Sequence, residues 1–438
     1  MAEAPNAPSG EPDLLGIGNG IVADGMDVFR ENAGLLIDGN RIAGIESTEK
    51  ILKASHRFID VKGRLILPGL LNAHHHLYSY PAPGIQPLGR TESFVNILEN
   101  LWWPLDAAMD EESVYYSALL GIIDSIKHGT TMLFDHHASM SFVRGSLASI
   151  ESAFKEAGIK GTLCFETSDR RGSAEALEHM AENVDFYNKH RDSKVLKGLF
   201  GLHANLTLSE ETLHEVHRKK PDGMTVHIHC GEDRADMEYC RELGYSGPVD
   251  RLFRFGLLNG DSILAHAVHL SEEDYHILRQ VNPVIVSNAE SNANNRVGQM
   301  DLQRIKRCVL GTDGMSGDMV SSLRSHFILA SDRDYGRLGD TFFKYKTAVQ
   351  RKFFPGTGSF ETGAAADIAV LNYAPVSPID RENLIGHIIF GARGGCVFMT
   401  VSNGKVLFQD GKITFADEEN LVREGKKAAD RLYRRYYG

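Results

Sequence analysis

Histidine and carboxylate side chains recur at the ends of apolar runs along this chain, and side chains of these types can hold a divalent metal. The first group, His74-His75-His76, follows the apolar run Leu65-Ile66-Leu67. Side chains two residues apart on a strand share a face, so we expect His74 and His76 to point one way and His75 the other. Two imidazoles at the end of a buried strand can hold a metal such as Zn²⁺ only if other strands supply the remaining ligands. Three adjacent histidines alone are at least as often a surface or packing cluster.

Later apolar runs end in the residues that such a centre still needs. One run, at 224–230, puts His229 near its end, with Glu232 three residues later. A carboxylate beside a histidine ligand can carry protons during hydrolysis at a metal. Another run ends at His266, and a third ends at Asp313, between glycines that permit close backbone approach. We therefore predict four metal ligands, His74, His76, His229 and Asp313, and three catalytic residues, Glu232, His266 and Asp313.

Two further histidines are interpreted as structural. His227 shares the parity of His229 but lies one layer deeper, so we predict a packed, hydrogen-bonded core residue. His269 follows the run that ends at His266 and has already entered a loop, which indicates a structural role. The roles of His75 and His136 stay open.

The predicted ligands need a scaffold of parallel strands whose ends meet. Apolar runs at 130–135, 160–166, 196–202, 224–230, 262–265, 284–287 and 308–311 alternate with helical periodicities such as 112–127, 146–157 and 209–218. With the first histidine-bearing strand this makes eight strands alternating with helices, which predicts an α/β fold of the (β/α)8 TIM-barrel type. In that fold, chemistry takes place at the carboxyl ends of the strands.

Short strand patterns flank the predicted barrel on both sides. They occur between residues 14 and 66, with a hairpin turn expected at Asp38-Gly39-Asn40, and return after about residue 360. We expect one small, discontinuous, β-sandwich-like domain built from both ends of the chain. The predicted segments are 1–66 for its first part, 67–358 for the metal-dependent hydrolase barrel, and 359–438 for its second part plus a terminal helix at 418–437.

Composition narrows the class of partner. Of 438 residues, 42% are hydrophobic and 24% charged, as in ordinary globular proteins, and no window approaches the ~18 unbroken apolar residues of a membrane span. The first twelve residues lack the basic and apolar regions of a secretory signal, so we interpret them as a loose tail and expect a cytoplasmic protein. Five cysteines without paired spacing argue against a disulfide framework. A net charge of −11 without a basic block disfavours nucleic acid, so we expect a small-molecule partner.

Together these motifs resemble those of a known superfamily. Asn72-Ala73-His74-His75-His76, His229 with Glu232, His266, and Gly311-Thr312-Asp313-Gly314 occur in the order, and on the strands, used by the amidohydrolase superfamily. The resemblance covers nearly the whole chain and is to the nucleobase-deaminase and chlorohydrolase branch. Four further runs most resemble the SsnA-type aminohydrolases: 101–103, Asp135-His136-His137-Ala138, Glu290-Ser291-Asn292 and 386–391. The run Ser287-Asn288-Ala289-Glu290 departs from the His-Asn-Pro-Glu-like run that is more usual there.

The resemblance also bears on the number of metals. Binuclear members bridge their metals with a carboxylated lysine at the end of the fourth strand, but that strand here ends Gly201-Leu202-His203-Ala204-Asn205. Lys197 lies six residues back, toward the opposite mouth. We therefore expect one divalent metal per chain, with zinc favoured over iron or manganese. As in deaminases, His203 becomes a candidate substrate contact, and the other candidates for substrate binding are Trp103, His137, Glu290 and Asn292.

The activity implied is that of a metal-dependent aminohydrolase of the cyclic amidine deaminase type. It would replace an exocyclic amino group of a purine-, pterin- or pyrimidine-like heterocycle with oxygen by means of a metal-bound hydroxide. Asp313 would accept the proton of the water, His266 would polarise or orient the nucleophile, and Glu232 would protonate a ring nitrogen and then the departing ammonia. The alternatives are ring-opening amide hydrolysis, dechlorination of a related heterocycle and, more remotely, a non-catalytic barrel scaffold. We expect a homodimer or a higher homo-oligomer.

Overall fold

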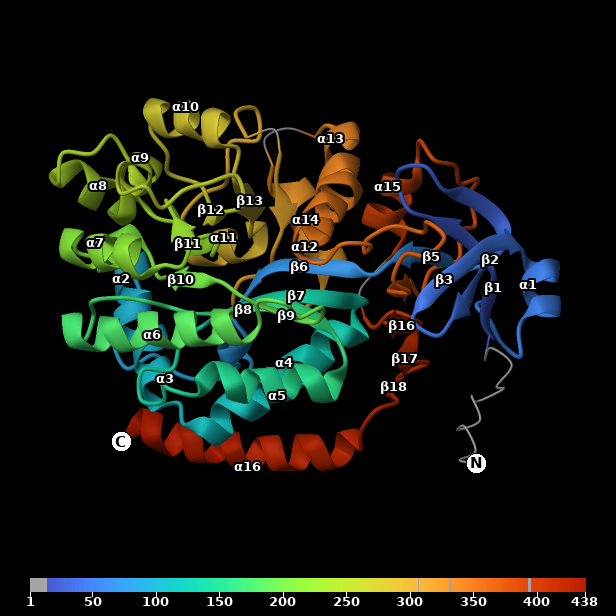
Figure 1. The fold of residues 1–438 in the computed structure, drawn as a ribbon, viewed down its shortest axis with the longest axis horizontal. Helices are drawn as coiled ribbons and strands as arrows, with labels where there is room; N and C mark the ends of the chain where they lie inside the picture. Colours follow the sequence, from blue (N-terminus) through green and yellow to red (C-terminus); the bar gives the residue numbers. More distant parts are fainter. Residues whose placement is uncertain (1–13, 306, 331–332, 393–394) are drawn as a thin grey trace, which may run out of the picture.

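A ring of parallel strands forms the larger part of the molecule (Figure 1). The computed structural model describes residues 14–305, 307–330, 333–392 and 395–438. Two parallel sheets, with strand orders β6-β7-β8-β9 and β10-β11-β12-β13-β14, meet at two seams. The bridges Thr167↔Leu202 and His75↔Asp313 join the sheets at these seams. Because β9 and β10 are two pieces of one barrel strand interrupted at Leu199, the ring has eight positions, and the predicted (β/α)8 barrel is confirmed.

The strands of the barrel are β6 (Leu70–His75), β7 (Thr130–His137), β8 (Lys160–Phe165), β9 (Leu196–Gly198), β10 (Phe200–Leu202), β11 (Val226–Cys230), β12 (Ile263–His266), β13 (Val284–Ser287) and β14 (Val309–Leu310). Their ends agree with the predicted ones to within two residues. Every residue of β7 and β8 is buried, as expected of strands that pack on both faces in a parallel sheet.

Helices surround the ring and connect its strands. They are α2 (Phe94–Ile97), α3 (Trp103–Ala108), α4 (Glu111–Lys127), α5 (Ser146–Ala157), α6 (Ser173–Lys189), α7 (Glu210–Lys219), α8 (Arg234–Glu242), α9 (Pro248–Arg254), α10 (Glu272–Val281), α11 (Ala289–Asn295), α12 (Met319–Leu329), α13 (Tyr335–Gly339) and α14 (Lys346–Phe353). Short 3-10 turns occur at Leu77–Ser79 and Asn205–Thr207, and π-helical turns at Leu98–Trp102, Asp340–Tyr345 and His387–Gly391.

A second sheet combines strands from both ends of the chain, as predicted. Its order is β18-β17-β16-β15-β5-β1-β2-β3, with β4 paired to β1. The elements are β1 (Leu14–Ala23), β2 (Phe29–Asp38), β3 (Arg41–Ser47), α1 (Thr48–Ala54), β4 (Arg57–Asp60), β5 (Leu65–Pro68), β15 (Ile368–Val370), α15 (Leu384–Gly386), β16 (Met399–Ser402), β17 (Lys405–Gln409) and β18 (Lys412–Ile413). The two halves meet where β15 pairs antiparallel with β5, and only Gly69 separates β5 from the first barrel strand. The expected boundaries at 66/67 and 358/359 stay predictions.

A buried ion pair ties this sheet to the barrel. The ammonium of Lys160, at the start of β8, lies 2.8 Å from Oδ2 of Asp367 and donates to Oδ1 of Asn403 at 2.5 Å. Both members of the pair are buried. The small domain is therefore fixed to the amino-terminal mouth of the barrel, away from the mouth that carries the histidines.

The terminal helix α16 (Glu418–Tyr437) has the predicted bounds but packs on the barrel and not on the small domain. It runs along α4 at the lower edge of Figure 1. Its last two turns are anchored by the Tyr433 hydroxyl, which donates to the carbonyl of Pro81 at 2.8 Å, and by Arg435 Nε, which donates to the carbonyl of Ala108 at 2.7 Å. No helix in the described ranges is both long and apolar enough to cross a membrane. The predicted tail at 1–12 lies outside these ranges.

Candidate active site

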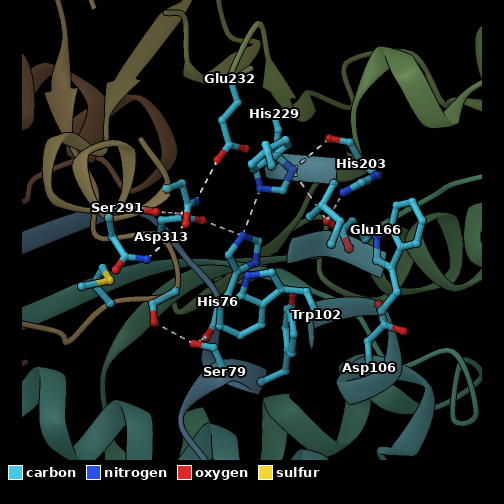
Figure 2. A pocket seen from close by; sticks show the side chains of 18 residues that line it. His76, Ser79, Trp102, Asp106, Glu166, His203, His229, Glu232, Ser291 and Asp313 are labelled. Atoms are coloured by element: carbon cyan, nitrogen blue, oxygen red, sulfur yellow. Dashed lines mark hydrogen bonds and ion pairs between the residues drawn. The ribbon is translucent and has the colours of Figure 1, made fainter. Parts of the chain in front are cut away.

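Four side chains converge at the carboxyl ends of the barrel strands, and they are the four predicted metal ligands. Oδ1 of Asp313 lies 2.8 Å from Nε2 of His76 and 3.3 Å from Nε2 of His74. Nε2 of His76 lies 3.0 Å from Nε2 of His229. The structure thus brings together residues that are up to 239 positions apart in the chain (Figure 2).

The segments that carry these ligands are locked together by backbone contacts. The amides of Thr312 and Asp313 both donate to the carbonyl of His74 at 3.0 Å. A Cβ at Gly311 would meet this same carbonyl oxygen at 2.8 Å, so glycine is required for the close approach. Asp313 itself has φ of +55°, in the left-handed region that costs free energy for a non-glycine residue. Strained backbone of this kind persists where the surroundings fix it, as they do here.

The tautomers of two histidines leave lone pairs directed at the convergence point. His76 donates from Nδ1 to the carbonyl of His136 at 2.6 Å, and His229 donates from Nδ1 to the carbonyl of His203 at 2.9 Å. A neutral imidazole with its proton on Nδ1 carries a lone pair on Nε2. Two such lone pairs 3.0 Å apart repel each other unless a cation lies between them.

Two further observations show that these side chains fit a divalent metal. Nε2 of His74 is buried and has no hydrogen-bond partner among the described residues. Burial lowers the pKa of His76, but the hydrogen bond and the charge of Asp313 outweigh burial and raise it to about 9. Burial likewise opposes ionisation of Asp313, yet the neighbouring imidazoles of His74 and His76 hold its pKa well below the usual range. The centre therefore favours a positive charge, and three imidazoles with one carboxylate are ligands that zinc accepts.

The two remaining catalytic candidates lie beside this centre. Oε2 of Glu232 is 3.5 Å from Nε2 of His266, and Oε1 accepts from Nδ2 of Asn295 at 3.3 Å. Glu232 is 9% exposed, and burial raises its pKa to about 7. His266 donates from Nδ1 to Oδ1 of Asn292 at 2.7 Å, and its Nε2 lies 3.4 Å from Nδ2 of Asn288. Glu232 can therefore hold or release a proton near neutral pH.

These residues open into a pocket of about 620 Å³, counted to its open mouth. Trp103 and His203 line the pocket, as predicted, together with Trp102, Tyr78 and Phe94. The predicted contacts His137, Glu290 and Asn292 do not reach its wall, so these three placements are corrected. The remaining residues of the wall include Asp106, Glu166, Ser291, Asn295 and Met315.

Each correction has a structural cause. Side chains alternate along β7, so His136 faces the barrel interior and His137 faces away, where its Nε2 contacts the Ser139 hydroxyl at 2.8 Å. On α11, Asn292 points at His266, while Glu290 is half-buried outside the pocket. Asn292 thus contacts a catalytic candidate, and its role in substrate binding stays a prediction.

The histidines outside the ligand set make hydrogen bonds that position their neighbours. His227 is buried, and its Nε2 lies 2.9 Å from Nδ1 of His74, which agrees with the predicted core role. Nδ1 of His75 contacts the Thr312 hydroxyl at 3.0 Å. Nε2 of His269 contacts the carbonyl of Val297 at 2.7 Å, as a structural residue would. Partners of this kind orient metal ligands and raise metal affinity.

Two acidic residues of the pocket were missed from the sequence. Glu166 directly follows β8, so its position at a strand end was a readable signal. Burial raises its pKa to about 7. Asp106 lies on α3, where only the turn of a short helix aims it inward. Burial raises its pKa to about 6, although the neighbouring Arg170 opposes this shift.

A parallel barrel that collects three histidines and an aspartate at its carboxyl mouth, with a separate buried glutamate, has the architecture of a metal-dependent hydrolase. The chain belongs to the amidohydrolase family, whose pattern matches residues 65–407. This confirms the superfamily resemblance drawn from the motifs.

Curated relatives match over most of their length. The chain is 28% identical over 406 residues to a 5-methylthioadenosine/S-adenosylhomocysteine deaminase of Thermococcus sibiricus, covering 89% of this chain and 93% of the relative. It is 29% identical over 440 residues to a 5'-deoxyadenosine deaminase of Methanobrevibacter smithii, covering 95% and 97%.

Solved structures share the fold. An adenosine deaminase from Xanthomonas campestris with bound zinc superposes with a TM-score of 0.79 at 20% identity, covering 96% of this chain and 98% of that one. The atrazine chlorohydrolase of Arthrobacter aurescens, complexed with zinc, gives a TM-score of 0.78 at 19% identity, covering 95% of this chain and 100% of that one. At these identities the likeness extends to the fold alone.

Proposed function

We propose that the protein is a metal-dependent aminohydrolase that replaces an exocyclic amino group of a purine-, pterin- or pyrimidine-like heterocycle with oxygen and releases ammonia. The observation that carries the proposal is Glu232, a buried carboxyl group that lies in the pocket beside the predicted ligands and titrates near neutral pH. Departure of ammonia requires a proton donor of this kind. The names of the curated relatives, all deaminases among those described above, support the same activity.

One divalent metal would be held by His74, His76, His229 and Asp313, and zinc suits this set of donors best. When bound, it would lower the pKa of water toward ~7 and so supply the nucleophile. Support for a single metal comes from the fourth strand, where Lys197 donates from Nζ to the carbonyl of Arg191 and so lies outside the pocket.

Three side chains of the site have separate roles in moving protons and in orienting the nucleophile. Asp313 accepts a hydrogen bond from Ser291 at Oδ2 and keeps lone pairs that can take a proton from the attacking water. His266, held at Nδ1 by Asn292, can orient the nucleophile from Nε2. Glu232 can pass a proton from Oε2 to a ring nitrogen and then to the departing amine. Water and the amino compound thus give the oxo compound and ammonia.

The walls of the pocket are suited to a flat heterocycle. Trp102 and Trp103 offer ring faces, and Leu98 and Phe94 add apolar surface. Adenosine-type nucleosides are further candidates because the relatives named above are deaminases of such compounds. The predicted homo-oligomer and cytoplasmic location stay predictions.

The experiment is a screen of the purified, zinc-loaded chain for ammonia release. Adenosine-type nucleosides, free purines, pterins and pyrimidines would be incubated with the wild type and with Glu232→Gln as the control. We expect ammonia from at least one compound with the wild type and a loss with the variant. Ring-opened product or chloride from a halogenated heterocycle, without ammonia from any amino compound, would replace the proposal by the corresponding alternative.

A further inference from the structure

Three side chains that can accept hydrogen bonds lie on one side of the pocket. Asp106, Glu166 and His203 line it, and we call these three residues the acceptor wall. Figure 2 shows them on the side opposite Glu232 and Asp313, with His76 and His229 between. They are 1%, 3% and 6% exposed, so water cannot readily satisfy them from outside the pocket.

His203 presents a lone pair to the pocket. The hydroxyl of Thr207 donates to the carbonyl of Ala204 at 3.1 Å, so its oxygen must accept from Nδ1 of His203 at 2.7 Å. With its proton on Nδ1, the neutral imidazole of His203 carries a lone pair on Nε2, which can accept a hydrogen bond. Oε1 of Glu166 lies 3.7 Å from this Nε2, too far for a hydrogen bond.

The two carboxylates of the wall also lack donors. Within the described part of the chain, no hydrogen bond reaches the side chain of Glu166, whose nearest cationic-type atoms are imidazole nitrogens at 3.6 to 3.7 Å. Asp106 uses Oδ2 to bind Nη2 of Arg170 at 2.8 Å, while its Oδ1 is buried without a partner. A buried acceptor without a donor has an unfavourable free energy, so a ligand that donates hydrogen bonds to these atoms binds more tightly.

We propose that the acceptor wall recognises a second donor-bearing edge of the heterocycle, so that the preferred substrate carries a further amino group besides the amino group that is lost. This inference rests on the proposed aminohydrolase function. The class of compound is a neutral amino-oxo or diamino heterocycle, such as a 2-aminopurine derivative or a pterin. Because Oε1 of Glu166 lies only 3.6 Å from Nδ1 of His229, the donor that Glu166 binds belongs to the ring at the metal centre and not to a distant substituent.

The negative charge of the pocket also favours a neutral ligand. Four carboxylates line it, from Asp106, Glu166, Glu232 and Asp313, and no Lys or Arg is among the described lining residues. The nearby guanidinium of Arg170 is paired with Asp106 and lies over the Trp103 ring at 4.9 Å. Phosphate or carboxylate substituents would therefore meet no free cation at the wall.

The test measures binding by ligands that have no amino group to lose at the reacting carbon. The only two tryptophans of the chain, Trp102 and Trp103, both line the pocket, so their fluorescence reports occupancy. The zinc-loaded full chain would be titrated with guanine and with hypoxanthine, which differ by one amino group, and guanine would be assayed for ammonia release in parallel. We expect guanine to release no ammonia and to bind about 10- to 100-fold more tightly, the range of one hydrogen bond to a charged group; release of ammonia from guanine would place its amino group at the metal centre and overturn the inference.

Glu166→Gln should reduce this preference to less than about threefold, with zinc content unchanged. The matched control is Glu182→Gln, which alters a buried carboxylate that accepts from the amides of Gly145 and Leu147 outside the pocket. It should keep the guanine preference. Equal binding of the two purines by the wild type, absence of binding by both, or an undiminished preference in Glu166→Gln would each overturn the inference.

Two additional measurements separate the neighbouring explanations. If the acceptor wall bound ribose hydroxyls instead, adenosine would bind more tightly than 2′,3′-dideoxyadenosine. Glu166→Gln would then remove that difference and leave the preference for guanine over hypoxanthine unchanged. This result would reject the inference. If the screen detects ammonia release but guanine is not preferred, the proposed function stands and the proposed role of the acceptor wall is rejected. A guanine preference without ammonia release from any compound keeps the wall and rejects the function.

Discussion

Replacing Glu232 by glutamine separates binding from chemistry. The side chain makes two long polar contacts, 3.3 Å to Nδ2 of Asn295 and 3.5 Å to Nε2 of His266, and glutamine has the same shape. Loss of such contacts should cost the fold no more than about 1 kcal/mol. Loss of the proton that Glu232 carries should reduce kcat by ~10²- to 10⁴-fold, or about 3 to 5 kcal/mol of barrier.

The assay combines three measurements on purified Glu232→Gln protein: metal content, affinity for a heterocyclic ligand, and ammonia release from the best compound of the screen. Metal content should match the wild type because Glu232 is not one of the four predicted ligands. Affinity should change little, since the residue acts mainly in the transition state. Retention of more than about a tenth of wild-type turnover would refute the proton-carrier role, because that loss is smaller than the low end of the expected range.

Three further outcomes are expected. Elemental analysis should find about one tightly bound divalent metal per chain, and two metals per active chain would contradict the single site. His229→Ala should lose metal and activity together, and a full metal content would remove His229 from the ligands. Burial lowers the pKa of Lys346 from 10.5 to about 7, so the unfolded state binds more protons between these values and stability rises with pH there. Lys346→Met should therefore raise the free energy of unfolding, and with it the urea midpoint, most at or below pH 7. The difference in unfolding free energy between variant and wild type should shrink toward pH 10, by up to about 1.4 kcal/mol per pH unit. A difference that does not depend on pH would contradict the pKa shift of Lys346.

The metal ligands could be predicted because each follows an apolar run, and the carboxyl ends of parallel strands meet whatever the connections between them contain. Parity sufficed for His74 and His76, although β6 ends one residue before His76. No comparable parity could be read for His136 and His137. Every residue of β7 is buried on both faces, so the apolar pattern does not reveal which face looks into the barrel. Only the contact of His136 with the carbonyl of Leu202 across the interior decides it.

The acceptor wall shows a different limit. Asp106 reaches the pocket because a short helix in the connection after the first barrel strand turns it inward, and no periodicity marks such a turn. The destination of α16 was also unreadable from the sequence. Its apolar stripe predicted a docked helix, but the partner, α4, is set by the route of the chain after β18.

The pairing of β5 with β15 dictates an order of events on the ribosome. Pro68 is paired with Ile368, so at ~5–20 residues per second the edge of β5 waits roughly 15 to 60 s for its partner to be synthesised. The bridge between His75 and Asp313 closes the barrel earlier, when the eighth strand has emerged. All four predicted ligands are therefore synthesised before the strand that completes the small domain, so the order of synthesis permits the metal-binding mouth to form first.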